Sequence, residues 1–306
     1  LRLALRDIAP FGRNVVYAGN VGRHVANLKT SIVMRIISII LGLFTIISCT
    51  SPKKIAKSEI RDELSDTTRV KHNDVYTEND FERLPIQLRT YFKNVGFIGK
   101  PKESSLKIEY DKGLIKMDTS SKWMNIMCDH LLFTNPHVRI VYLKAHLFWI
   151  IPFEGRDKYK AGQGNMLGTI AKLIKIFDVS DKEMNQSALV TFLSEILFMP
   201  SACLSDSITW EQIDTNSIKA TIADSGLKGS GIFYFNDTGE LLRFTTNDRF
   251  EGKTSRPWIL RFENYKNFDD YYLPSKGVAT WQYPDLEFDY FIAYFKGFIY
   301  DTKSEK

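Results

Sequence analysis

Apolar and polar residues alternate with a period of two over most of the chain after residue 200. Seven stretches show this pattern, and turn-forming residues separate them. They are 208–213, 217–223, 231–235, 240–246, 258–265, 271–283 and 288–300. The separators Asp224-Ser225-Gly226 and Asn236-Asp237-Thr238-Gly239 have the composition of tight turns. Many short strands at this spacing predict an antiparallel meander.

The preceding hundred or so residues contain further strand candidates. Apolar positions alternate over 106–110, and the Asp-Lys-Gly sequence at 111–113 predicts a turn or a bulge. Apolar stretches also predict strands at 123–133, 138–151 and 166–179. The glycine-rich stretch 155–168 is expected to separate two of them, as a loop or bulge.

Two stretches carry a helical period. The first spans 84–96, with Pro85 near its start and Gly96 at its end. The second spans 187–199, where Ser187 is the expected cap and Pro200 lies just past the end. Its apolar stripe consists of Leu189, Phe192, Leu193, Ile196 and Leu197. Strands interrupted by a few helices predict an α+β fold, with helices on one face of a curved antiparallel sheet.

The N-terminal region contains an apolar run, 36–47, that is shorter than the ~20 residues of a membrane span. With Met34 and Arg35 before it, it has the layout of a secretory signal peptide. Its end, Ile46-Ile47-Ser48-Cys49, resembles the lipobox of bacterial lipoproteins. That resemblance implies a lipid on Cys49, the palmitate-type acylation that holds a protein on a membrane. The alternative is a plain signal peptide that is cleaved near a cysteine.

These features divide the chain into four parts. Residues 1–33 precede the first methionine, Met34, and are expected to be an over-extended gene start. Residues 34–48 are the predicted signal peptide, 49–79 a flexible lipid-anchored tether, and 80–306 a single β-rich domain. Thr50 follows Cys49, where some bacteria use aspartate for inner-membrane retention. The expected location is therefore the cell envelope, on the outer membrane facing the periplasm.

Charge and cysteine content exclude several classes of protein. The chain has 41 Lys and Arg against 36 Asp and Glu, but six of these bases and one acid lie in 1–48. The remainder is balanced, so no nucleic-acid partner is expected. Cys128 and Cys203 are expected to be buried thiols, not a disulfide. The histidines lack metal-ligand spacing and no nucleotide-binding loop is present, so no metal and no cofactor is expected.

Several residues remain as candidates for a site. Glu195 lies opposite the apolar stripe of the 187–199 helix, where the competing interpretation is an ordinary exposed glutamate. Tryptophans on successive predicted strands favour an apolar groove, although they equally fit an ordinary core. Arg156-Asp157 and Asp248-Arg249 fit surface pairs. The ligand-binding candidates are Trp123, Trp149, Tyr159, Glu195, Phe198, Trp210 and Arg249.

The chain resembles an uncharacterised bacterial family, a domain of unknown function found in predicted envelope proteins. The similar stretches include LPIQLRTYFKNVGFIGKP (84–101), GRDKYKAGQGNM (155–166), LVTFLSEILFMPSACL (189–204) and RPWILRFENY (256–265). The pattern around Glu195, Pro200, Ala202 and Trp210 is the most recognisable. Where the family usually has glutamine after Trp123-Met124, this chain has His130. The layout is also similar to periplasmic carriers of lipids and lipoproteins, which implies a strongly curved sheet, or incomplete barrel, closed by helices over an apolar cavity.

Three functions follow as hypotheses. The preferred one is a monomeric lipoprotein, held on the membrane through Cys49, that binds or carries an apolar small molecule, a lipid or a partner's apolar segment. The second is a hydrolase or transferase with Glu195 as general acid or base, aided by Asp157 or Arg249, which needs a raised Glu195 pKa. The third is a structural envelope protein without a ligand.

Overall fold

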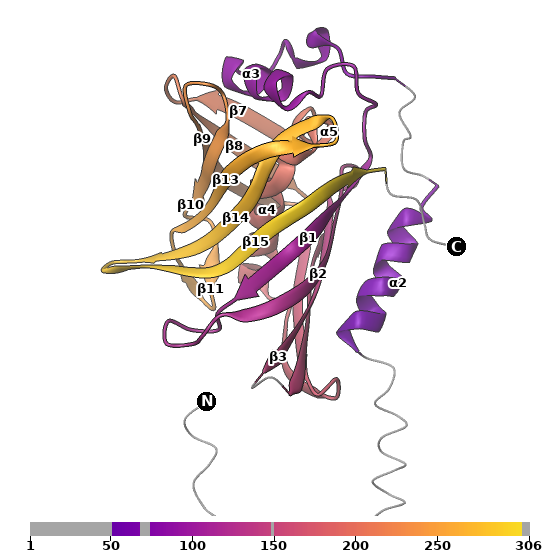
Figure 1. Ribbon diagram of the computed structural model, residues 1–306, viewed down its shortest axis with the longest axis vertical. Coiled ribbons are helices and arrows are strands. Elements are labelled where there is room, and N and C mark those ends of the chain that lie inside the picture. The colour runs from indigo at the N-terminus through magenta and orange to yellow at the C-terminus, as the bar shows by residue number, and fades with distance from the viewer. Residues whose placement is uncertain (1–50, 68–73, 148–149, 302–306) are drawn as a thin grey trace, which may run out of the picture. The chain divides into compact units, whose positions relative to one another are not determined.

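The computed structural model describes residues 51–67, 74–147 and 150–301 (Figure 1). Thr50–Lys306 forms one structural unit. The predicted segments 1–33 and 34–48, the predicted lipidation residue Cys49 and the ligand candidate Trp149 lie outside the described residues. Within the described residues, no helix has the length and hydropathy needed to cross a membrane.

One antiparallel sheet of thirteen strands dominates the structure (Figure 1). From one edge to the other, the strands are β6 (Ile174–Val179), β5 (Gln163–Ile170), β4 (Ile151–Lys160), β3 (Val138–Leu147), β2 (Met124–Phe133), β1 (Ser105–Ile115), β15 (Leu286–Tyr300), β14 (Tyr271–Tyr283), β13 (Trp258–Phe268), β10 (Leu241–Thr246), β9 (Leu227–Phe235), β8 (Ser217–Asp224) and β7 (Ile208–Gln212). A separate hairpin pairs β11 (Phe250–Glu251) with β12 (Thr254–Ser255). Neighbouring strands in the sheet are consecutive in the chain, except where β1 meets β15 and β10 meets β13.

The strands of the C-terminal half follow the alternating pattern of the sequence closely. The N-terminal half differs in three places, one of which is the predicted strand 166–179, because β5 ends at Ile170 and β6 begins at Ile174. The stretch 138–151 is not one strand, because β3 ends at Leu147 and β4 begins at Ile151. The glycine-rich stretch 155–168 is not a separator but the β4–β5 hairpin. Its glycines serve packing: a Cβ on Gly164 would lie 2.6 Å from the Met184 carbonyl oxygen, so glycine permits a helix to approach the strand.

Four α-helices and two 3₁₀ turns complete the described chain. They are α2 (Pro52–Leu64), η2 (Glu78–Phe81), α3 (Ile86–Val95), α4 (Lys182–Glu195), η3 (Ile196–Phe198) and α5 (Pro200–Cys203). The predicted 84–96 helix is confirmed as α3, which Gly96 ends at a φ of 94°. The predicted 187–199 helix starts earlier, because the Asp181 side chain caps it by accepting from the Met184 N–H, and its last turn is η3.

Helix α4 is the centre of the core. It contacts β4 and β5 near one edge of the sheet, and β8 and β9 near the other. From Ser187 to Glu195 every residue of α4 is buried, which gives a helix with no water-facing side in that stretch. The large antiparallel sheet with few helices is confirmed. The edge strands β6 and β7 do not pair with each other, so the sheet is not a closed barrel, and the strong curvature of an incomplete barrel stays a prediction.

Helix α2 corrects the expectation of a fully flexible tether over 49–79. Its apolar residues Ala56, Ile60 and Leu64 pack on β2 and β3, against Phe133 and Ile140 among others. Charged side chains add to the attachment: the Glu59 carboxylate accepts from Arg156 at 3.2 Å and Lys158 at 3.0 Å, and Glu63 accepts from Lys160 at 2.5 Å. The segment Pro52–Leu64 is therefore attached to the sheet by both apolar and charged contacts.

Candidate functional site

Strand register brings three polar side chains to the face of the sheet that α4 covers. His130 on β2 pairs with Val141 on β3, which pairs with Asp157 on β4, so these side chains share a face. Arg139 lies two positions before Val141 on β3 and therefore points to the same face. Glu195, the last residue of α4, meets them there. All four side chains are largely withdrawn from water.

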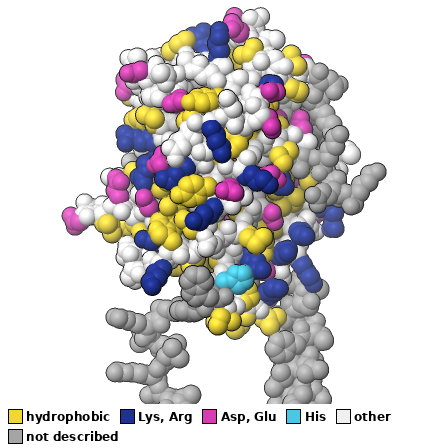
Figure 2. Space-filling model, in the orientation of Figure 1, with side chains coloured by type: hydrophobic (Ala, Val, Ile, Leu, Met, Phe, Trp, Pro, Cys, Tyr) yellow, Lys and Arg dark blue, Asp and Glu magenta, His cyan; other side chains and the backbone are white. Residues whose placement is uncertain are grey.

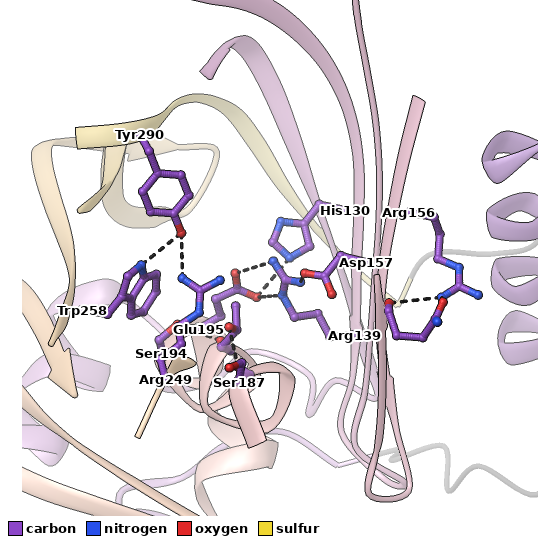
Figure 3. Close-up of polar contacts among 12 residues, drawn as sticks. His130, Arg139, Arg156, Asp157, Ser187, Ser194, Glu195, Arg249, Trp258 and Tyr290 are labelled. Atoms are coloured by element: carbon purple, nitrogen blue, oxygen red, sulfur yellow. Dashed lines mark hydrogen bonds and ion pairs between the residues drawn. The ribbon is translucent and has the colours of Figure 1, made fainter. Parts of the chain in front are cut away.

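These four residues form a hydrogen-bonded charge cluster (Figure 3). The Arg139 guanidinium donates through Nε to Glu195 Oε2 at 2.9 Å and through Nη2 to Glu195 Oε1 at 3.2 Å. Its Nη1 donates to Asp157 Oδ2 at 2.7 Å. His130 Nε2 lies 3.0 Å from Glu195 Oε2, and its Nδ1 lies 2.9 Å from the Tyr110 hydroxyl. The cluster thus ties α4 to β1, β2, β3 and β4.

The cluster keeps Glu195 ionised. Burial raises the pKa of a carboxyl group, but the charge of Arg139 and the contact with His130 outweigh it and lower the pKa of Glu195 to about 2. For Arg139, burial alone would lower the pKa, but the carboxylates of Glu195 and Asp157 outweigh burial and raise the pKa of the guanidinium. A general acid needs a raised pKa, and both Glu195 oxygens already accept hydrogen bonds. The geometry therefore favours a clamp over a proton donor.

The polar side of α4 faces protein and not water, contrary to the exposed-glutamate interpretation. Thr191 Oγ1 donates to the Ser187 carbonyl at 2.7 Å, and Ser194 Oγ donates to the Thr191 carbonyl at 2.7 Å. The Phe250 N–H donates to Ser187 Oγ at 2.9 Å and so joins the β11–β12 hairpin to the helix. A hydroxyl that donates a hydrogen bond to a backbone carbonyl of its own helix can be buried with little loss of folding free energy.

Arg249 belongs to a second polar group, close to α4 in Figure 3. Its guanidinium stacks 4.3 Å from the ring centre of Trp258 and 5.1 Å from that of Trp281. Its Nη1 donates to the Tyr290 hydroxyl at 2.7 Å, which also accepts from Trp258 Nε1 at 3.0 Å. Arg249 Nε and Asp157 Oδ1 are buried without a hydrogen-bond partner.

The other predicted ligand residues lie apart from one another. Phe198 is 2% exposed and packs on Phe262, Phe295 and Phe298, so its ring fills the core. Tyr159 is fully buried, and its hydroxyl donates to Asp224 at 2.6 Å. Trp123 precedes β2 and is half-buried, with Lys116 Nζ 4.9 Å from its ring centre. These three described members of the predicted set therefore lie in separate surroundings.

Trp210 lies at a cleft of about 650 Å³ between the start of α3, the α5–β7 connection and β7. Its indole N–H donates to the Cys203 carbonyl at 3.2 Å, which fixes the ring. The cleft is lined by Arg83, Leu84, Pro85, Cys203, Ser205, Asp206, Ile208, Thr209, Trp210 and Gln212. Strand β7 is an edge strand and pairs only with β8 among the described strands. The cleft thus combines apolar surface with a sheet edge that no described strand covers.

The sequence patterns did not identify Arg139, Tyr110 and Tyr290 as candidate site residues. Arg139 carried a usable signal, because it is a charged residue inside the apolar stretch 138–143, where a buried partner is expected. Cys128 and Cys203 are both free thiols. Among the described residues, no group of three or more His, Cys, Asp or Glu is arranged to hold a metal ion.

Comparisons with known proteins place the chain in a family without assigning an activity. The family model described as "Family of unknown function (DUF6544)" matches residues 74–293. That match covers most of the described structure, including the charge cluster and the cleft. No curated protein and no solved structure matches the chain. The chain therefore belongs to the DUF6544 family, a family of unknown function.

Proposed function

We propose that this protein is a lipoprotein of the bacterial cell envelope, anchored through Cys49, that binds an apolar ligand or an extended partner segment in the cleft at β7. The anchor proposal is supported by the lipobox-like sequence at 46–49, which follows an apolar run with the length of a signal-peptide core. We place it on the outer membrane, facing the periplasm, from Thr50 after Cys49.

The observation that carries the binding proposal is the position of Trp210 beside a free strand edge. Trp210 and Ile208 of β7, with Leu84 and Pro85, supply apolar surface to the cleft. An edge strand offers backbone N–H and C=O groups that an extended segment pairs with, while side-chain pockets give selectivity. The core around Phe198 is filled, so we place the ligand in this surface cleft and not between the sheet and α4.

The hydrolase alternative has less support from the geometry. It assigned proton transfer to Glu195 with help from Asp157 or Arg249. Glu195 and Asp157 instead share the Arg139 guanidinium, and Arg249 is held by Tyr290 and two indole rings. The resemblance in layout to periplasmic carriers does not carry the binding proposal, because α4 and the rings packed on Phe198 fill the region where a carrier would have its cavity.

The test is native mass spectrometry of the full chain purified from bacterial membranes. We expect a stoichiometric extra mass that organic extraction removes. Trp210→Ala should lose most of this mass because the substitution removes the largest apolar side chain of the cleft lining. Trp123→Ala is the matched control, since Trp123 is also half-buried but lies outside the cleft. A ligand-free wild-type chain, or equal loss in both variants, contradicts the proposal.

A further inference from the structure

Large hydrophobic side chains are exposed at one end of the sheet. The most exposed are Ile150 at 81%, Met127 at 71% and Ile174 at 63% of their surface. Ile151, Leu173 and Ile176 are exposed by 36–42%. Single exposed apolar residues are ordinary, but several on neighbouring turns mark a contact surface. Figure 2 shows hydrophobic side chains gathered at the lower end of the described part, with Lys and Arg side chains beside them.

Strand register shows that these residues share one end. Ile150 and Ile151 form the end of the β3–β4 connection, and Leu173 precedes β6 in the β5–β6 turn. The two turns are adjacent, because the Ala171 N–H donates to the Pro152 carbonyl at 2.8 Å and Phe153 pairs with Ile170. Met127 on β2 lies opposite Lys144 on β3, three residues before Leu147.

The charges around this surface suit an anionic lipid layer. Lys172 and Lys175 are exposed in and beside the β5–β6 turn, and Lys144 lies next to Met127. Lys175 is paired with Asp178 at 2.9 Å. Exposed apolar side chains flanked by lysines are the composition of segments that lie in the interfacial layer of a membrane.

The chain itself brings the predicted anchor to the same end. Ser51 Oγ donates to Glu154 Oε2 at 3.2 Å, and Glu154 lies three residues after Ile151 on β4. Ser51 follows Cys49 by two residues, and a chain of that length spans at most about 7 Å. A lipid on Cys49 would therefore enter the bilayer beside the Ile150–Ile151 turn.

We infer that this end, the membrane-facing tip (Met127, Ile150, Ile151, Leu173, Ile174 and Ile176), rests in the interfacial layer of the membrane that holds Cys49. The inference rests on the proposed lipid attachment and adds an orientation to it. The tip and the lipid are two contacts with the same bilayer, so the domain stands on the membrane in a fixed direction instead of swinging on a tether.

The proposed orientation determines how far the cleft lies from the membrane surface. His137, just before β3, contacts Ser207 of the α5–β7 connection at 2.7 Å, so the cleft lies at the start of β3. The tip lies at the end of β3, and the ten residues of this strand span about 33 Å. The cleft is therefore held roughly 30 Å from the bilayer, where a partner in the aqueous space reaches it.

Depth-dependent fluorescence quenching tests this orientation. The full chain, in a Cys128→Ala background, is labelled with an environment-sensitive dye at Ile174→Cys or, separately, at Ile150→Cys. It is reconstituted in vesicles of phosphatidylethanolamine and phosphatidylglycerol that contain nitroxide-labelled lipid. The matched control is Ile86→Cys, an isoleucine 51% exposed that neighbours Pro85 at the cleft. The mass of the N-terminal peptide establishes first whether Cys49 carries lipid.

We expect blue-shifted emission and several-fold stronger nitroxide quenching at both tip positions than at Ile86→Cys. An acylated chain whose tip dyes are no more quenched than the control overturns the inference and leaves the anchor intact. A blue shift without quenching by lipid shows that a second copy covers the tip, which also overturns it. An unacylated N-terminal peptide refutes the proposed lipid attachment, and the inference falls with it.

Discussion

Replacing Arg139 with methionine removes the cation that two buried carboxylates share. Glu195 accepts two hydrogen bonds from Arg139, and Asp157 accepts one. Removing one partner of a buried ion pair typically costs 3–5 kcal/mol, because the remaining charge is left without compensation. The lowered pKa of Glu195 has the same physical cause, because the guanidinium charge of Arg139 stabilises the ionised carboxylate in the folded state. We therefore expect Arg139→Met to lower the free energy of unfolding by about 3–5 kcal/mol at pH 7.

The pH dependence gives this prediction a distinctive sign. In the wild type the folded-state pKa of Glu195 is depressed, so its contribution is present above pH 4.5 and is lost as the pH falls toward 2. In Arg139→Met, burial without the guanidinium raises the folded-state pKa of Glu195. The folded variant then takes up a proton more readily than the unfolded chain, and its deficit shrinks as the pH falls from 7 to 5.

Urea unfolding followed by far-UV circular dichroism at pH 7 and pH 5 measures both effects. Arg83→Met is the matched control, because Arg83 pairs with Asp206 at 3.3 Å on the surface, where the loss is expected to be below about 1 kcal/mol. The reasoning is refuted if Arg139→Met costs no more than Arg83→Met, or if its deficit grows on acidification.

Three further predictions concern other parts of the structure. Burial raises the pKa of Glu103 to about 7, so the folded protein holds this proton more tightly than the unfolded chain, and the free energy of unfolding falls as the pH rises from 4.5 to 7. Glu103→Gln should flatten this dependence of the free energy of unfolding on pH in urea unfolding, and an unchanged slope contradicts the prediction. Ala56→Asp places a charge in the apolar contact between α2 and the sheet, so α2 should detach. Limited proteolysis should then cut 51–66 while the sheet domain stays intact. Because Cys128 and Cys203 are free, reductant should leave the melting temperature unchanged, and a fall would reveal a disulfide.

The strands and α3 could be predicted because their signals are local. Alternation of apolar residues marks β8 directly, and Pro85 and Gly96 mark the ends of α3. Helix α2 was harder to predict from the sequence, although its apolar residues Ala56, Ile60 and Leu64 recur every four residues. Most of its other residues are polar, and part of its attachment comes from ion pairs with β4, about 100 residues away.

The candidate site was only partly predictable for the same reason. Glu195 was identified, but its side of the helix is polar, and a local pattern places a polar side in water. Its partners His130 and Arg139 lie 65 and 56 residues earlier, and only the sheet brings them together. Phe198 shows the opposite error, since an aromatic ring predicted to meet a ligand is covered by three other rings.

The central claim, anchorage of this domain through Cys49, has a direct test. Cells that express the full chain are grown with labelled palmitate, and the wild type is compared with Cys49→Ala. We predict label in the wild-type protein and none in the variant, because Cys49 supplies both the thiol and the new N-terminus that are acylated. Label in both proteins, or in neither, contradicts the account.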